Sequence, residues 1–176
     1  SYYDKVAGHH PQMGAVSFQN AENLQYSHIY SHDYHGWRDT KAATQGFNAF
    51  VAKQKEKISE VSFYTTEDNA RYRVQIYKKF EDNTLSELVS VTEGAIQQTG
   101  FHTIKLDWPV YVDKGENFYV ELTVNKGGLA YDKTSDVPVL LGGGQRTLVT
   151  STASAGESYY LAGKQWVDLH GENASA

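Results

Sequence analysis

The chain contains no cysteine, and this absence excludes several chemistries at once. Without a thiol there is no disulfide framework, no cysteine nucleophile and no cysteine-ligated zinc site. Long apolar runs are missing too, because no stretch approaches the roughly 18 residues that a membrane-spanning helix requires. No charged and then apolar leader opens the chain. We therefore expect a chain that does not span a membrane and whose fold rests on an ordinary hydrophobic core.

Basic charge is also scarce. The sequence has 16 Lys and Arg residues against 21 Asp and Glu residues, for a net charge of −5. Nucleic-acid-binding domains usually carry a basic patch, so no nucleic-acid partner is expected. A length of 176 residues suits one domain, which can bury a substantial core without a metal or disulfide.

Tyrosine is abundant, with 13 residues, and the clearest structural pattern is an alternation between Ile58 and Phe80. Aromatic and β-branched residues recur there with period two, which predicts two strands over 58–65 and 71–77. The outward positions of the first strand are Glu60, Ser62 and Tyr64. Polar residues at Thr66–Ala70 predict either a hairpin or a tight strand-to-strand connection between the two strands.

Short strands separated by turn residues are predicted along most of the chain. In Phe101–Trp108, the alternation predicts that His102, Ile104, Leu106 and Trp108 point inward. About nine or ten strands and no sustained helical period predict an all-β, jelly-roll-like antiparallel β-sandwich. The other candidate strands are Ser1–Asp4, Ala15–Phe18, Ala49–Ala52, Leu85–Val91, Phe118–Val124, Val137–Leu141, Thr147–Thr150, Tyr159–Leu161 and Gln165–Leu169.

Two groups of aromatic and acidic residues are candidates for a carbohydrate site. Exposed rings stack on the apolar face of a sugar, while polar groups orient its hydroxyls. The first group comprises Tyr30, Asp33, Tyr34 and Trp37, and the second comprises Trp166 and Asp168. The alternative for Trp37 is packing, either within the sandwich or against a neighbouring domain.

Metal sites are weaker hypotheses. His28, His32 and His35 are spaced closely enough to supply imidazole ligands, although a solvated loop explains them equally simply. Asp132 with Asp136, or Glu67 with Asp68, could hold a structural calcium ion. No other cofactor is expected.

Catalytic motifs are missing from the sequence. It has no Gly-x-Ser-x-Gly nucleophile elbow, and Gly142–Gly144 lacks the residues that complete a phosphate-binding loop. Together with the absence of cysteine, this predicts that the chain alone is not an enzyme.

An ordered set of short motifs resembles the lectin-like β-sandwich domain found C-terminal to papain-like cysteine peptidases of bacteria and archaea. The resemblance covers about Tyr26–Leu169. The motifs are Ile29-Tyr30 with Asp33 and Gly36-Trp37, Phe63-Tyr64-Thr65, Tyr72 with Ile76-Tyr77, Gly100–Ile104 with Leu106 and Pro109-Val110, Gly115-Glu116 with Phe118, and Ser158-Tyr159 with Trp166 and Leu169.

The resemblance implies a division of the chain. Residues 1–25 would be an extension or linker, in which Ser1–Asp4 is the exit strand of a preceding peptidase domain. Residues 26–176 would be the lectin-like sandwich. Such domains usually end with one further strand, so either the chain is truncated at Ala176 or a partner protomer supplies that strand.

The same resemblance implies a function and a location. The chain would be a non-catalytic accessory domain of a secreted or cell-surface peptidase, in a parent protein that is itself a papain-like enzyme. It would target the peptidase to glycans or cell-surface substrates, or stabilise it, and its partner would be the peptidase domain or a cleaved fragment of it. The alternative is a structural or adhesive subunit that assembles through an open sheet edge.

Overall fold

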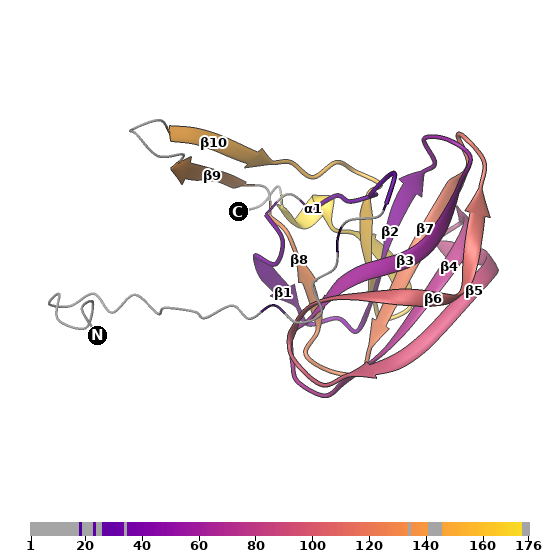
Figure 1. Cartoon of the computed structure of the whole chain (residues 1–176). Helices are drawn as coiled ribbons and strands as arrows, with labels where there is room; N and C mark the ends of the chain where they lie inside the picture. Colours follow the sequence, from indigo (N-terminus) through magenta and orange to yellow (C-terminus); the bar gives the residue numbers. More distant parts are fainter. Residues whose placement is uncertain are drawn as a thin grey trace, which may run out of the picture.

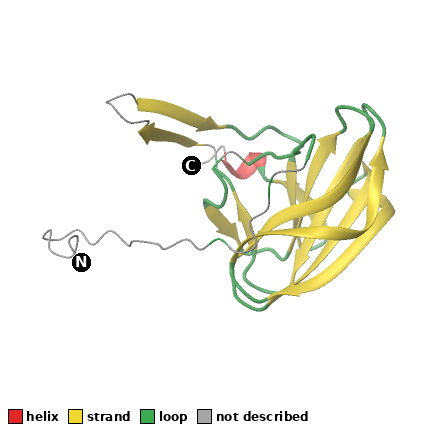
Figure 2. Cartoon of the chain, viewed as in Figure 1, coloured by secondary structure: helices red, strands yellow, loops and turns green. Residues whose placement is uncertain are grey.

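A computed structural model describes residues 18, 23, 26–33, 35–133, 135–140 and 146–173, with the backbone alone at 135–140, 146–149 and 172–173. Most of the fold is a six-stranded antiparallel sheet (Figures 1 and 2). In spatial order its strands are β12 (Gln165–Asp168), β11 (Ser158–Ala162), β2 (Gln45–Val51), β7 (Asn117–Val124), β4 (Ala70–Glu81) and β5 (Thr84–Ile96). The first seventeen residues, including the predicted strand Ser1–Asp4, lie outside the described residues.

A second sheet of two long strands, β3 (Glu56–Thr65) and β6 (Gly100–Val112), lies across one face of the six-stranded sheet (Figure 1). The chain passes between the two sheets repeatedly, because β2, β4, β5 and β7 belong to one and β3 and β6 to the other. The predicted all-β, jelly-roll-like antiparallel sandwich is therefore confirmed.

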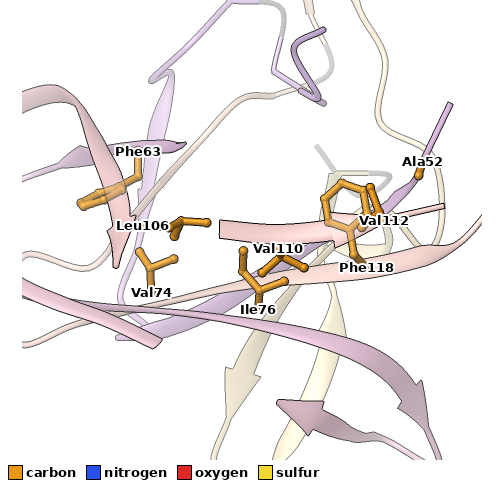
Figure 3. Close-up of a cluster of buried hydrophobic side chains, with 8 residues drawn as sticks. All are labelled: Ala52, Phe63, Val74, Ile76, Leu106, Val110, Val112 and Phe118. Atoms are coloured by element: carbon orange, nitrogen blue, oxygen red, sulfur yellow. The ribbon is translucent and has the colours of Figure 1, made fainter. Parts of the chain in front are cut away.

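The hydrophobic core fills the space between these two sheets (Figure 3). Inward positions of β7 and β4 alternate with outward ones, so Phe118, Val74 and Ile76 are almost fully buried. Burying such a side chain stabilises the fold by about 1.5–3 kcal/mol each. The remaining buried members of the cluster are Ala52, Phe63, Leu106, Val110 and Val112.

Two small sheets and a short helix complete the described structure. Strand β1 (Asp39–Lys41) pairs with β8 (Leu129–Tyr131), and β9 (Ser135–Leu140) pairs with β10 (Arg146–Ser151). Helix α1 (His170–Asn173) is a single turn. No helix in the described part of the chain is long and apolar enough to cross a membrane.

The part of the chain that the structure describes has twelve strands, more than the nine or ten predicted. Two of them, β1 and β8, have three residues each and are too short to show an alternating pattern. The predicted strands Val137–Leu141 and Thr147–Thr150 correspond to β9 and β10. Of the predicted strand Ala15–Phe18, only Phe18 is described, and it is not in a strand.

The segment Thr66–Asn69 connects two strands that do not pair with each other. Strand β3 pairs with β6, whereas β4 pairs with β5 and β7. Of the two predictions for this region, the tight connection is correct and the hairpin is wrong. The loop carries the chain from one sheet to the other.

Trp108 contradicts the predicted inward row, because it is 74% exposed. The cause is an irregularity in the β3–β6 pairing. Ile58 pairs with Val110 and Glu60 with Lys105, so residues 106–109 lie opposite Ser59 alone. This extra length bends β6 and turns the Trp108 side chain outward, as β-bulges do. The backbone carbonyl of Trp108 accepts a hydrogen bond from Ser90 Oγ at 2.8 Å.

Candidate functional site

Tyr30 is the best-anchored residue of the first predicted group. Its ring packs at 5.2 Å edge-on against Phe118 and at 5.8 Å against Phe50. Its hydroxyl accepts a hydrogen bond from the Lys53 backbone N–H at 2.8 Å and donates one to the Glu56 carboxylate. Burial, followed by the bond to Glu56, raises the pKa of Tyr30. Tyr30 therefore fixes the 26–33 segment onto the core, and its part in sugar binding stays a prediction.

Asp33 lies near the Tyr30 anchor but in a different environment. The residue is solvent-exposed, yet protein atoms crowd around its carboxyl group, and this desolvation raises the pKa of Asp33. The nearby Asp132 carboxylate raises it further, and His32 lowers it. Tyr34, another member of the predicted group, lies outside the described residues.

Trp37 is partly exposed, at 38%, and belongs to a row of three aromatic rings. Its ring lies 6.1 Å from that of Tyr64, and the Tyr64 ring lies 4.9 Å from that of Phe101. Phe101 is 58% exposed. We call Trp37, Tyr64 and Phe101 the aromatic platform. Trp37 Nε1 donates a hydrogen bond to Thr40 Oγ1 at 3.0 Å, which helps to fix the indole.

The platform lies on the outer face of the β3–β6 sheet. Phe63 points into the core, so its neighbour Tyr64 points outward, and Phe101 is the cross-strand partner of Tyr64. Cross-strand aromatic pairs stabilise a sheet and hold each other's rings in place. The platform therefore consists of side chains presented by a two-stranded sheet, with Trp37 added from the preceding loop.

Gly36 allows the loop to approach the platform closely. Its φ of +69° is in the left-handed region, which glycine adopts without strain. A Cβ at this position would lie 2.7 Å from the Tyr64 hydroxyl oxygen. A larger residue would push Tyr64 away, and the Trp37–Tyr64 contact depends on this glycine.

Polar side chains continue the surface beside the platform. Ser62 and Thr103, the next cross-strand pair along the same face, share a hydrogen bond of 2.8 Å between their hydroxyls. Both residues, together with Tyr64 and Phe101, line a cavity of about 940 Å³. Exposed rings beside hydroxyl groups at a broad concavity can bind a sugar through stacking and hydrogen bonds.

Sequence reasoning identified Trp37 but missed its two partners. The alternation placed Tyr64 on the outward face of its strand, and this outward position could have identified it as a surface ring. The alternation in Phe101–Trp108 likewise placed Phe101 outward, but its pairing with Tyr64 depends on which strands are neighbours. That pairing links residues 37 positions apart in the chain.

Trp166 and Asp168, the second predicted group, have structural partners. The Trp166 ring packs edge-on against Phe47 at 4.9 Å. Both carboxylate oxygens of Asp168 accept backbone N–H groups, from Gly156 at 2.7 Å and from His170 at 2.9 Å. The structure thus uses Trp166 to cover Phe47 and Asp168 to hold the loop before β11 next to the start of α1.

The three candidate metal-binding histidines face three different acids. His28 Nδ1 lies 3.3 Å from Glu56, His32 Nδ1 lies 3.7 Å from Glu157, and His35 Nδ1 lies 4.0 Å from Asp132. Within the ranges that the structure describes, no three His, Asp or Glu residues are arranged to hold a metal ion. The described structure does not bring these three histidines together around one point, and both metal hypotheses stay predictions.

A buried Ser–Asp–His cluster superficially resembles a hydrolytic triad. Asp132 accepts hydrogen bonds from Ser151 Oγ at 2.7 Å and from the His35 backbone N–H at 2.9 Å. In a triad the histidine contacts the serine and the acid lies behind it. Here the acid lies between the other two, so the histidine is not placed to activate the hydroxyl. The cluster instead ties the end of β10 to the loop before β1.

Comparisons with known proteins agree with this geometry. A family model described as "Lectin like domain" matches residues 29–176. Among solved structures, the chain is similar to the cysteine protease and lectin-like domains of Cwp84, a surface layer associated protein of Clostridium difficile. The TM-score is 0.57 at 19% identity, and the match covers 77% of this chain but 30% of that one.

The structural match supports the fold, while the family model supports the family. No curated protein is significantly similar in sequence to the chain. The division at residues 25 and 26 stays a prediction. Because the family model covers most of the sequence, the chain belongs to the lectin-like domain family.

Proposed function

We propose that this chain is the non-catalytic accessory domain of a surface-associated papain-like cysteine peptidase, and that it binds carbohydrate through the aromatic platform. The observation that carries the proposal is the row of Trp37, Tyr64 and Phe101. Phe101 is 58% exposed although its strand has a well-packed apolar face, so its exposure is not a consequence of poor packing.

The peptidase association rests on the family and on the solved relative, in which a lectin-like domain and a cysteine protease domain occur together. The chain spans about a third of that relative, so the peptidase itself would lie outside the sequence described. That relative is a surface layer associated protein, which supports a cell-surface or extracellular location for this chain. In this role the domain would hold the peptidase near polysaccharide-rich substrates.

Co-sedimentation with insoluble peptidoglycan, chitin and cellulose tests the carbohydrate-binding part. We expect the purified chain to sediment with at least one polymer and Trp37→Ala to stay in solution. Trp108→Ala is the matched control, because Trp108 is also an exposed tryptophan but lies outside the platform. Failure of the wild type to bind any polymer, or equal loss in both tryptophan variants, would contradict the proposal.

A further inference from the structure

On β7 and β4, the outer face of the six-stranded sheet carries planar polar side chains, beside the aromatic cluster around Phe47 of β2. On β7, Glu121 and Thr123 alternate with the core-facing residues Val120 and Leu122. Glu121 pairs with Gln75 of β4, and Thr123 pairs with Gln45 of β2. These outer positions form a surface at the centre of the sheet, on the side opposite the aromatic platform.

The side chains on this surface hold one another in place. Gln75 Nε2 donates a hydrogen bond to the Tyr77 hydroxyl at 3.0 Å, and Tyr77 is bonded in turn to Glu121. Arg73, on the same face of β4, is hydrogen-bonded to Glu93 through its Nε. We call Arg73, Gln75, Tyr77 and Glu121 the polar network. Gln75, Tyr77 and Glu121 are held by their mutual bonds before any ligand arrives, which lowers the entropic cost of binding.

Glu121 is the unusual member, because it is a carboxylate with only 5% exposure whose cross-strand partners are Phe47 of β2 and Gln75 of β4. Neighbouring side chains of its own sheet bury it. A buried carboxylate costs stability unless it is well bonded, and such groups concentrate at functional sites. The bond with Tyr77 shows what Glu121 does: it fixes the position of the tyrosine ring and hydroxyl.

The chemistry of the surface matches a polyhydroxylated ligand. The Gln75 amide and the Arg73 guanidinium each present more than one donor or acceptor in a plane, which suits adjacent hydroxyl groups. Tyr119, on the same face, adds an aromatic ring beside them and joins the ring cluster around Phe47.

From this we infer that the polar network is a second carbohydrate-binding site, on the opposite side of the sandwich from the aromatic platform. Arg73, Gln75 and Tyr77 contact the sugar, and Glu121 is a positioning residue. The inference goes beyond the proposed function, because two sites on opposite faces allow one domain to bridge two polysaccharide chains. Bridging raises retention on a polymer surface through effective concentration without any new contact.

A nuclear magnetic resonance titration in the Trp37→Ala background separates this site from the platform. The probes are chitotetraose, cellotetraose and soluble peptidoglycan fragments. We expect shifts of backbone amides at Arg73–Tyr77 and Glu121, and their loss when Arg73→Ala and Gln75→Ala are added. Lys79→Ala is the matched control, because it removes an exposed ion pair with Glu81 from the same strand outside the network.

Each outcome of the titration either supports or refutes the second site. If the wild type binds and Trp37→Ala shows no shifts with any probe, the second site is refuted and the platform stands. Binding that survives Trp37→Ala but disappears with the network variants supports the second site. Should Lys79→Ala abolish those shifts as well, or the wild type bind no probe, the inference fails.

The positioning role of Glu121 has its own test. Glu121→Gln keeps the shape of the side chain while weakening its hold on the Tyr77 hydroxyl. In the Trp37→Ala background we expect about a tenfold weaker affinity, with the Tyr77 resonances shifted before ligand is added. Unchanged affinity and unchanged Tyr77 resonances would overturn this role.

Discussion

At the scale of single residues, the fates of Tyr30 and Trp37 show how one aromatic cluster divides between packing and binding. Tyr30 has ring contacts to the core and two hydrogen bonds at its hydroxyl. Trp37 has one ring contact, to Tyr64, and one hydrogen bond. Tyr30 is thus tied to the fold through both its ring and its hydroxyl, whereas Trp37 leaves 38% of its surface exposed.

The loss of folding stability on replacing Trp37 shows whether this residue belongs to the core or to the surface. Trp37→Ala removes one aromatic contact and one hydrogen bond, and we expect a loss of about 1–2 kcal/mol. In a domain of this size that corresponds to a drop of roughly 2–8 °C in Tm. Phe118→Ala, a fully buried reference, should cost about 3–5 kcal/mol. Thermal melts of both variants provide the measurement, and equal losses would show that Trp37 is a core residue.

The raised pKa of Glu121 predicts that the free energy of unfolding depends on pH. Burial raises the pKa of Glu121 above its ordinary value, although bonding to Tyr77 and the Arg73 charge partly offset this. A raised carboxyl pKa stabilises the fold below the unfolded-state value of about 4.3 and loses that contribution as the pH rises through the folded-state value. The unfolding free energy of the wild type, relative to that of Glu121→Gln, should therefore fall with rising pH. Urea denaturation at several pH values would show it, and a constant difference would contradict the assignment.

At the scale of secondary-structure elements, alternation in the sequence predicted strands well but could not predict which strands pair. The two strands around Thr66–Asn69 were visible as strands, yet their partners lie far along the chain. Trp108 shows the same limit within one strand. Its inward position followed from an unbroken period of two, and the pairing irregularity opposite Ser59 breaks that period. Both outcomes depend on cross-strand contacts, which a local pattern does not contain.

The connection between β4 and β5 is an element that the sequence did signal. The turn at Asp82 and Asn83 has positive φ at both residues, +47° and +58°, which is the two-residue geometry preferred by tight hairpins. Asn83 also bonds the Trp166 backbone twice, at 2.7 and 2.8 Å. The turn therefore links the two edge strands of the sheet, β5 and β12.

Two substitutions at Asn83 separate its hydrogen bonds to Trp166 from its left-handed backbone conformation. Asn83→Ala should cost about 2–4 kcal/mol, because it loses both hydrogen bonds and strains a left-handed residue. Asn83→Gly tolerates that conformation, so it should cost about 1–2 kcal/mol less. Chemical denaturation of the two variants measures the difference. Equal costs would mean that the backbone strain contributes nothing.

At the scale of the whole molecule, the sandwich presents two unlike surfaces on either side of one core. The β3–β6 sheet carries the aromatic platform, and the six-stranded sheet carries the polar network. The all-β fold and the family followed from the sequence, whereas the platform required knowledge of which strands are adjacent. Candidate residues that lie close in sequence, such as the three histidines, separated in space because an irregular segment carries them.

The alternative of a strand-exchanging adhesive subunit makes a different prediction for the solution state. An accessory domain whose sheets are complete should be a monodisperse monomer of about 19.7 kDa. Size-exclusion chromatography with light scattering measures this directly. Dimers or filaments that persist on dilution would favour assembly through an open sheet edge.

The central claim is that the aromatic platform binds carbohydrate, and a matched pair of affinities tests it most directly. Phe101 and Tyr111 are both highly exposed rings on β6, but only Phe101 belongs to the platform. Isothermal titration with the saccharide selected by co-sedimentation should show Phe101→Ala weakened by about tenfold, or about 1.4 kcal/mol, and Tyr111→Ala unchanged. Equal affinities for Phe101→Ala and the wild type would contradict the account.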